Sequence, residues 1–498
     1  MNDSLFAHIQ AAMPGPTSPF LDTATKRYSY GDLDRLSAAL GHRLLALGVE
    51  QGDRVAVQVE KSPQAVFLYL ACLRIGAVYL PLNTGYTLRE LDYFFGDAEP
   101  RVIVCDPARE RAVGGIAGAR AVVTLDAGEA GSLMDGASHP ADLEPVACEA
   151  DDLAALLYTS GTTGRSKGAM LTHRNLASNA LALREAWGFT GADVLLHVLP
   201  IYHTHGLFVA INTVLLAGAR MLFLPRFDPD AVIPALAHAT VMMGVPTYYT
   251  RLLARDDFTA AVAGGVRVFI SGSAPLLEET FVAFEARTGQ RILERYGMTE
   301  TGMNTSNPLH GERRAGTVGL PLPGVEVRVA GEVGRPLAAG EVGVLEVRGP
   351  NVFKGYWRMP EKTAEEFRDD GFFITGDISV IGEDGYVSIV GRAKDLVISG
   401  GLNVYPKEVE SLIDSLPGVV ESAVVGLPHP DFGEAVAAVV VLERGATVTE
   451  IDIVTAARSE LAGFKVPKTV LFVEALPRNS MGKVQKNILR ADYGHTFK

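Results

Sequence analysis

Cysteine, tryptophan and long apolar runs are scarce in this chain. The three cysteines, Cys72, Cys105 and Cys148, lie far apart and fit no metal-binding spacing. This predicts reduced thiols and argues against a disulfide framework or a zinc site. The longest apolar tract, residues 66–82, is broken by an arginine, a glycine and a proline, and it is shorter than the roughly 20 residues that a membrane span needs. We expect a buried helix followed by a strand there.

Basic charge is also in deficit, with a formal net charge of −13 and a pI near 5.4. Such a balance is unsuited to non-specific binding of nucleic acid or acidic membranes, so we expect small-molecule partners and a monomer or weak homo-oligomer. Residues 1–10 carry no secretory or organellar signal pattern, which predicts a cytoplasmic location. A hydrophobic content of 48% is typical of a soluble globular protein, and 498 residues predict two or more domains.

Helical patterns alternate with short β-branched runs over residues 30–125 and again over 194–270, which predicts layered α/β structure with a largely parallel sheet. Short strands with frequent glycine predict a β-rich subdomain over residues 325–391, and a small α+β domain follows. We therefore divide the chain into residues 1–391 and 392–498. Helices are expected at residues 32–47, 63–75, 207–216, 406–416 and 450–461, and strands at 54–59, 78–80, 101–105, 194–199, 220–224, 241–245, 266–270, 326–329, 342–348, 386–389, 419–427, 435–442 and 469–473.

Residues 158–168, Tyr-Thr-Ser-Gly-Thr-Thr-Gly-Arg-Ser-Lys-Gly, form a dense polar stretch. Glycines allow successive N–H groups to face an anion, while hydroxyls and cations add donors and charge. This predicts a loop that holds a nucleotide triphosphate. The order Ser166-Lys167-Gly168 differs from a Walker loop, so kinase or P-loop NTPase chemistry is not expected. On composition alone, a solvated surface loop is the alternative.

Five further segments place polar residues inside or beside apolar runs, where such groups are costly unless they are used. With the loop and with residues 477–483, and in this order, they resemble the adenylate-forming superfamily of acyl-CoA synthetases, adenylation domains and luciferases. The resemblance covers nearly the whole chain. It implies a large N-terminal domain of layered α/β and β-barrel parts with a small mobile C-terminal domain. The five segments are residues 200–206, 271–275, 294–301, 372–377 and 391–395.

The resemblance implies that ATP and a carboxylate react with the help of Mg²⁺ to give an acyl-adenylate and pyrophosphate, and that CoA then accepts the acyl group. Glu300 would ligate Mg²⁺ together with Thr159, and Asp377 would bind the ribose hydroxyls. A capping carboxylate and a simple turn are the respective alternatives. The expected ATP-binding residues are Thr159, Ser160, Gly161, Thr162, Thr163, Gly164, Lys167, Ser273, Ala274, Tyr296, Gly297, Met298, Thr299, Asp377, Arg392 and Lys483.

Lys483 is the expected catalytic residue, assisted by Glu300 and Thr159. A cation on a long stem can reach both the substrate carboxylate and the bridging phosphate oxygen as charge builds there. A solvated lysine in a basic run is the alternative. For the thioester step, the resemblance implies a hinge at Lys394 and a CoA path that the segment Ser399-Gly400-Gly401 lines.

The expected acyl pocket departs from an apolar one. His203, His205 and Ser271 contribute polar groups, and Arg251 places a guanidinium on the helix that should face the substrate. A buried arginine is costly without a partner and its planar fork suits a carboxylate, so we expect Arg251 to bind the far carboxylate of a dicarboxylic acid. These features resemble malonyl-CoA synthetases, which implies malonate, and often methylmalonate, as the substrate.

Several alternatives stay open. Arg251 pointing to solvent would remove the dicarboxylate argument, and His203 and His205 are equally suited to a core or gating role. A short-chain or aryl monocarboxylate acyl-CoA synthetase is the nearest competing function. A nucleotide-binding regulatory protein and an adenylation protein that loads a carrier are more distant ones.

Overall fold

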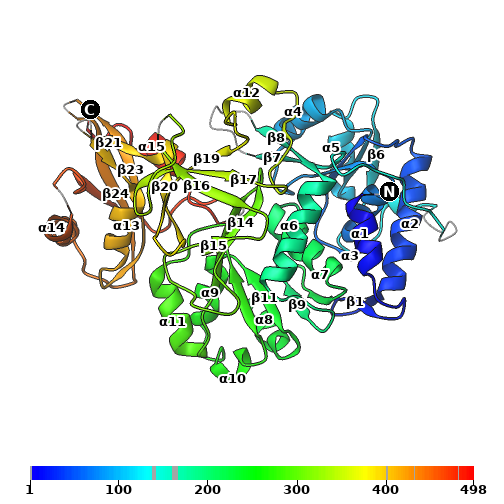
Figure 1. Cartoon of the computed structure of the whole chain (residues 1–498), viewed down its shortest axis with the longest axis horizontal. Coiled ribbons are helices and arrows are strands. Elements are labelled where there is room, and N and C mark those ends of the chain that lie inside the picture. The colour runs from blue at the N-terminus through cyan, green and yellow to red at the C-terminus, as the bar shows by residue number, and fades with distance from the viewer. Residues whose placement is uncertain are drawn as a thin grey trace.

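The computed structural model describes residues 3–136, 142–159, 166–331, 333–399, 402–430, 432–461, 463–479 and 482–497. Three sheets with most of the helices build a large N-terminal part, and a fourth sheet with the last helices forms a small C-terminal part at one end of the long axis (Figure 1). Of the helices described, none is both long and apolar enough to cross a lipid bilayer.

The largest sheet has nine strands, and its centre is parallel, as the alternation of helices and short strands predicted. The carboxyl ends of parallel strands meet at one edge of a sheet, where α/β proteins usually bind ligands. The strand order is β15 (Leu320–Pro321), β14 (Gly302–Ser306), β13 (Leu293–Met298), β12 (Val268–Ser271), β11 (Val241–Gly244), β9 (Val194–His197), β10 (Arg220–Phe223), β1 (Pro19–Asp22) and β2 (Arg27–Ser29).

A second sheet of seven strands is also parallel over most of its width. The exceptions are two antiparallel pairs at one edge. The register of one of them places Thr159 opposite Lys167, so the two ends of the predicted phosphate loop lie side by side. The order is β18 (Gly355–Tyr356), β8 (Lys167–Thr172), β7 (Leu153–Thr159), β4 (Val78–Pro81), β3 (Arg54–Gln58), β5 (Val102–Cys105) and β6 (Ala121–Thr124).

The β-rich subdomain is an antiparallel sheet in the order β16 (Glu326–Ala330), β17 (Val342–Arg348), β19 (Phe373–Ile381) and β20 (Val387–Arg392). The fourth sheet, which dominates the small part, pairs β22 (Leu402–Val404), β21 (Val397–Ser399), β24 (Gly433–Leu442) and β23 (Val419–His429), with β25 (Thr469–Phe472) on β24. The short helix η5 (Ala393–Asp395) separates β20 from β21.

Polar caps fix where several helices begin. In α2, α4, α6 and α14 a serine or threonine side chain accepts the backbone N–H three residues on, whose own side chain returns a hydrogen bond. The helices are α1 (Leu5–Ala12), α2 (Tyr30–Ala46), α3 (Pro63–Arg74), α4 (Leu88–Ala98), α5 (Glu110–Gly114), α6 (His173–Ala186), α7 (Asn212–Leu216), α8 (Pro229–Ala235), α9 (Pro246–Leu253), α10 (Ala260–Ala263), α11 (Glu278–Thr288), α12 (Pro360–Glu365), α13 (Pro406–Asp414), α14 (Glu450–Glu460) and α15 (Lys486–Tyr493).

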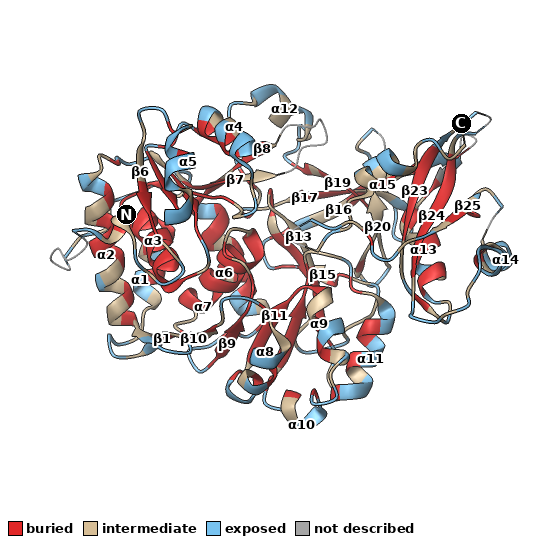
Figure 2. Ribbon diagram, turned by 180° about the vertical axis from the view of Figure 1, so that it is seen from behind, coloured by how far each residue is buried: buried red, intermediate tan, exposed pale blue. Residues whose placement is uncertain are grey.

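The buried residues are mainly in the strands of the sheets and in the helices between them (Figure 2). Every residue of α3 is buried, and so is every residue of β4. The apolar tract at residues 66–82 is therefore a buried helix followed by a strand, as predicted.

One predicted helix has a different form. Instead of a regular α-helix over residues 207–216, the chain makes a π-helical turn, η3 (His205–Ile211), and then the short α7. Widened turns of this kind occur often at functional sites. This one begins at His205, which is buried.

Candidate active site

Two hydrogen bonds show where the sheets of the large part converge. The Thr159 hydroxyl, at the end of β7, donates to Glu300 Oε1 at 3.3 Å, and Glu300 follows β13. The Tyr296 hydroxyl, on β13, donates to Asp377 on β19. The nine-, seven- and four-stranded sheets therefore meet around these side chains, and the strand ends carry most of the residues that the sequence singled out.

The phosphate loop is described only at its two ends. The expected ligands Ser160, Gly161, Thr162, Thr163 and Gly164 lie outside the described residues. Lys167 is buried, and its ammonium group pairs with Glu366 Oε1 at 3.0 Å. It also lies 4.0 Å from the centre of the Tyr356 ring.

Glu300 is a buried carboxylate that accepts two hydroxyl hydrogen bonds at Oε1, from Thr159 and, at 3.2 Å, from Tyr356. Burial raises its pKa above the ordinary value, because the charged form is poorly solvated. Among the described residues, no three His, Cys, Asp or Glu side chains cluster as a metal site. One carboxylate beside a hydroxyl fits Mg²⁺, which takes few protein ligands and completes its shell with phosphate oxygens and water.

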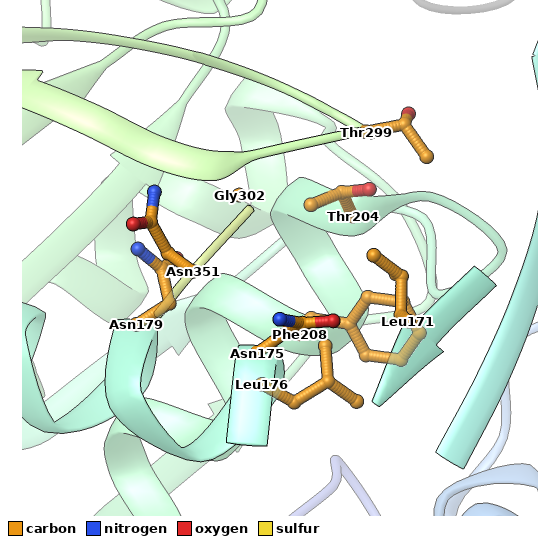
Figure 3. Close-up of a pocket in the computed structure, with 9 residues that line it drawn as sticks. All are labelled: Leu171, Asn175, Leu176, Asn179, Thr204, Phe208, Thr299, Gly302 and Asn351. Carbon is orange, nitrogen blue, oxygen red and sulfur yellow. The ribbon is translucent and has the colours of Figure 1, made fainter. Parts of the chain in front are cut away.

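Buried asparagines support the turn that carries Glu300. Asn351 donates to the Thr301 carbonyl oxygen at 2.7 Å, and Asn179 both accepts from and donates to the Met303 backbone. These side chains surround a cavity of about 10 Å³, with Thr299 at its rim (Figure 3). Sequence reasoning missed this support, although asparagine in otherwise apolar segments was a visible signal.

Asp377 is held by two neighbouring side chains. One oxygen accepts the Tyr296 hydroxyl, and the other pairs with Arg392 Nε at 2.5 Å. The structure thus brings together Tyr296, Asp377 and Arg392, three of the residues expected to bind ATP. Ser273 lies nearby in a left-handed conformation, φ 72°, with its hydroxyl 3.1 Å from His205 Nδ1.

Lys483 reaches this site from the small C-terminal part. Burial lowers the pKa of its ammonium group to about 8, Arg392 and Arg295 lower it too, and Asp377 and Glu300 oppose them. The residue as a whole still has an exposed surface, so it lies at the mouth of the site. Its neighbour Gly482 packs near α9.

Both histidines of the predicted acyl pocket are neutral near pH 7. Burial lowers the pKa of His203 to about 3, and Lys483 and Arg295 contribute. Burial also holds the pKa of His205 well below its ordinary value. They therefore offer hydrogen bonds and not charge to a carboxylate. The expectation that Arg251 is buried was wrong, because its position near the end of α9 exposes it.

The buried cation at this site is Arg295, which the sequence reading passed over. Arg295 is 3% exposed, and its Nε and Nη2 have no hydrogen-bond partner among the described residues. Burial lowers its pKa to about 10. The guanidinium lies against Gly272, where a Cβ would come within 2.5 Å of Cζ. The arginine within the sequence of β13, Leu-Glu-Arg-Tyr-Gly-Met, was the available signal, but the sequence interpretation used this segment as a whole motif and assigned no role to Arg295 itself.

Other buried polar atoms nearby also lack hydrogen-bond partners within the described part of the chain. They are Nδ1 of His203, Nε2 of His205 and Oγ of Ser271. Ser271 adjoins Gly272, and the charge on Arg295 lowers the pKa of both histidines, so these groups surround one location. Buried polar atoms are rarely left unsatisfied in proteins, and their concentration here indicates a polar ligand.

Comparison with known proteins agrees with this geometry. Residues 9–357 match the model of the AMP-binding enzyme family, and residues 408–483 match the model of the AMP-binding enzyme C-terminal domain. The chain belongs to the AMP-binding enzyme family. It is 37% identical to a feruloyl-CoA synthase from Amycolatopsis, covering 94% of both chains, and 35% identical to malonate–CoA ligase from Arabidopsis thaliana, covering 93% of this chain and 84% of the relative.

The AMP-binding enzyme is also similar to a solved structure, MatB from Rhodopseudomonas palustris, at 56% identity over the full length of both chains. The TM-score is 0.98 against ATP-bound MatB and 0.87 against apo MatB. The overall arrangement is thus nearer the ATP-bound form, in keeping with the position of Lys483 at the site.

The residues predicted for the CoA half of the reaction follow Arg392 in the sequence. Lys394 belongs to η5, and Ser399 is buried at the end of β21. Gly400 and Gly401 lie outside the described residues. Their roles in this AMP-binding enzyme, and the division of the chain at residue 391, stay predictions.

Proposed function

We propose that the protein is a malonate–CoA ligase. ATP and malonate form malonyl-adenylate and pyrophosphate, and CoA displaces AMP to give malonyl-CoA. We expect methylmalonate to be accepted as well. The observation that carries the proposal is the buried guanidinium of Arg295 beside His203, His205 and Ser271. Its Nε and Nη2 have no hydrogen-bond partner in the part of the chain that the structure describes.

The charge on Arg295 favours a dicarboxylate. An unpaired cation is costly to bury, and an arginine fork matches a carboxylate in shape and charge. Malonate has a second carboxylate to offer once the first has attacked the phosphate, whereas an apolar or aryl acid would leave Arg295 unpaired. The similarity to MatB and to malonate–CoA ligase supports the same conclusion.

In the proposal, Arg251 is a second cation that lies outside the buried pocket. It lies one turn after Thr247 on α9, and its charge lowers the pKa of Tyr248, opposing the larger effect of burial. Within the described ranges, the side chain of Arg251 makes no hydrogen bond or ion pair. We expect it to attract the dicarboxylate at the pocket mouth and Arg295 to bind it inside.

The adenylation step follows from the positions of the charges. A carboxylate oxygen of malonate attacks the α-phosphorus as the bond to pyrophosphate breaks, so two anions must be held together. In the proposal, the ammonium group of Lys483 contacts both the attacking carboxylate and the bridging oxygen, and its electrostatic interaction with Asp377 and Glu300 supports this role. Glu300 and Thr159 would hold Mg²⁺, which neutralises charge on the phosphates. Arg392 and Asp377 position the ribose.

The thioester step needs no protein nucleophile. The CoA thiolate attacks the carbonyl carbon of the mixed anhydride, and AMP leaves with the bridging oxygen. In the proposal the small C-terminal part turns about Lys394, which removes Lys483 from the site and brings Ser399, Gly400 and Gly401 to the pantetheine.

We also propose a cytoplasmic setting. All three cysteines are buried free thiols, which fits a reducing compartment such as the cytoplasm. The acidic net charge fits small-molecule partners and a monomer or weak homo-oligomer.

The test is a substrate panel. Pyrophosphate release and CoA-thioester formation are measured with ATP, Mg²⁺ and CoA for malonate, methylmalonate, succinate, acetate, butyrate, octanoate, coumarate and ferulate. We expect malonate to give the highest kcat/KM. The similarity to feruloyl-CoA synthase favours an aryl acid as the second candidate, and a preference for ferulate or coumarate would replace the malonate proposal.

A further inference from the structure

Glu366, which directly follows α12, contacts three groups around the phosphate loop. Its Oε1 lies 3.0 Å from the ammonium nitrogen of Lys167 and 3.1 Å from that of Lys362. Its Oε2 accepts the Tyr356 hydroxyl at 2.7 Å. Its backbone carbonyl accepts the N–H of Ile374 on β19 at 2.8 Å. Glu366 therefore links two sheets: its carboxylate contacts the seven-stranded sheet, and its backbone carbonyl contacts the four-stranded one.

The pair with Lys167 differs from an ordinary surface ion pair. The side chains of Lys167 and Glu366 are only 10% and 20% exposed, so solvent screens their attraction weakly. Lys167 is held on a second side by the face of the Tyr356 ring. Since Lys167 also lies opposite Thr159 in the β7–β8 register, these contacts fix the base of the phosphate loop.

Tyr356 connects Glu366 to Glu300. Its hydroxyl oxygen lies 3.2 Å from Glu300 Oε1 and 2.7 Å from Glu366 Oε2. A phenol has one proton to donate, so its donation to one carboxylate depends on the position of the other. A displacement of Glu366 is therefore transmitted both to Lys167 and to Glu300.

We propose that Glu366 is a positioning residue for adenylation, which orients Lys167 at the base of the phosphate loop and, through Tyr356, orients Glu300. Glu366 does not contact the reacting atoms in this scheme. Its effect is confined to the phosphate end of the nucleotide, because its carboxylate contacts Lys167, Lys362 and Tyr356. The residues expected at the ribose and adenine are not among these contacts. The inference rests on the adenylation half of the proposed function and not on the identity of the carboxylic acid.

The variant that tests this inference is Glu366→Gln, which removes the charge and keeps the size of the side chain. Glu365→Gln is the matched control, because Glu365 is exposed and its ion pair is with Lys362 at 2.9 Å. Calorimetry measures the affinity for a non-hydrolysable ATP analogue with Mg²⁺ and for AMP. Pyrophosphate exchange with malonate then gives the Mg²⁺ concentration for half-maximal rate.

For Glu366→Gln we expect an affinity for the ATP analogue about tenfold lower, as for loss of a hydrogen-bonded charge, and a higher Mg²⁺ requirement. AMP affinity and the rate of thioester formation from supplied malonyl-adenylate should match wild type and Glu365→Gln. Equal losses for the ATP analogue and AMP would indicate a merely structural role and overturn the proposal, as would unchanged ATP affinity and Mg²⁺ requirement.

Tyr356→Phe covers the case in which Glu366→Gln does not fold. It keeps the ring beneath Lys167 and removes only the hydroxyl between the two carboxylates. We expect a raised Mg²⁺ requirement with AMP affinity retained, and an unchanged Mg²⁺ requirement would contradict the link to Glu300. Nucleotide binding needs no carboxylic acid, so the calorimetric affinities for the ATP analogue and for AMP can be interpreted even if malonate is not the substrate.

Discussion

At the scale of single residues, the proposed acyl pocket is marked by buried polar atoms that have no hydrogen-bond partner among the residues described. Arg295 is the strongest case, since its guanidinium is nearly inaccessible and two of its nitrogens are unsatisfied. Such a group destabilises the empty protein, and a bound carboxylate would satisfy it.

Replacing Arg295 by methionine should therefore separate binding from stability. We expect the KM for malonate to rise about 100-fold, as for loss of a charged hydrogen-bonding partner, while the thermal midpoint is unchanged or higher. Steady-state kinetics and thermal unfolding measure the two effects. Arg251→Ala is the companion variant, and we expect it to raise the KM as well. A normal malonate KM in Arg295→Met would remove Arg295 from the pocket.

The pKa of Lys483 predicts the pH above which activity declines. Its folded pKa is lowered to about 8, so the ammonium form is present below that pH and is lost as the pH rises through it. The value of kcat/KM for ATP, which follows the ionisation of the free enzyme, should fall above a pH of about 8. In Lys483→Arg the charge persists, and the residual activity should show no such decline. An identical decline in both proteins would assign it to another group.

At the scale of elements, the turn after β13 depends on side chains from distant segments. Asn351 donates to the Thr301 carbonyl oxygen and to Asn304, and the Phe353 N–H donates to the Glu300 carbonyl oxygen at 2.7 Å. The geometry of Glu300 is thus set by the segment between β17 and β18 as well as by its own strand.

Asn351→Ala should loosen this turn. We expect a loss of about 1–3 kcal/mol in the free energy of unfolding, because buried acceptors lose their donor, together with a lower kcat for pyrophosphate exchange. Denaturant unfolding and exchange assays measure these effects. Thioester formation from supplied malonyl-adenylate should be retained, and a loss confined to that step would contradict the role assigned to the turn.

At the scale of the whole molecule, the small C-terminal part supplies Lys483 to a site otherwise built by the large part. In the proposed cycle this cation serves adenylation and then leaves.

Lys483→Ala should consequently separate the two half-reactions. We expect malonate-dependent pyrophosphate exchange to fall by at least about 100-fold, as for loss of a group that stabilises the transition state. The conversion of supplied malonyl-adenylate and CoA to malonyl-CoA should stay near the wild-type rate, measured by chromatography of the thioester. A comparable loss in both half-reactions would place Lys483 in the second step too.

The sequence by itself determined the elements and the order of the site segments. The strand predicted at residues 342–348 has those bounds as β17, and the helix predicted at 63–75 is α3, one residue shorter, because hydrophobic periodicity and capping act over short distances. The segments around Glu300, Asp377 and Lys483 were recognisable from their residues, and the tertiary structure brings them together.

Only the tertiary structure decided which cation is buried. Arg251 and Arg295 look alike in the sequence, yet the end of α9 is open to solvent while β13 lies between two strands. The links from Glu366 to Lys167 and from Asn351 to Thr301 join residues 199 and 50 positions apart. Burial and partners of this kind depend on packing between distant segments, which local patterns do not encode.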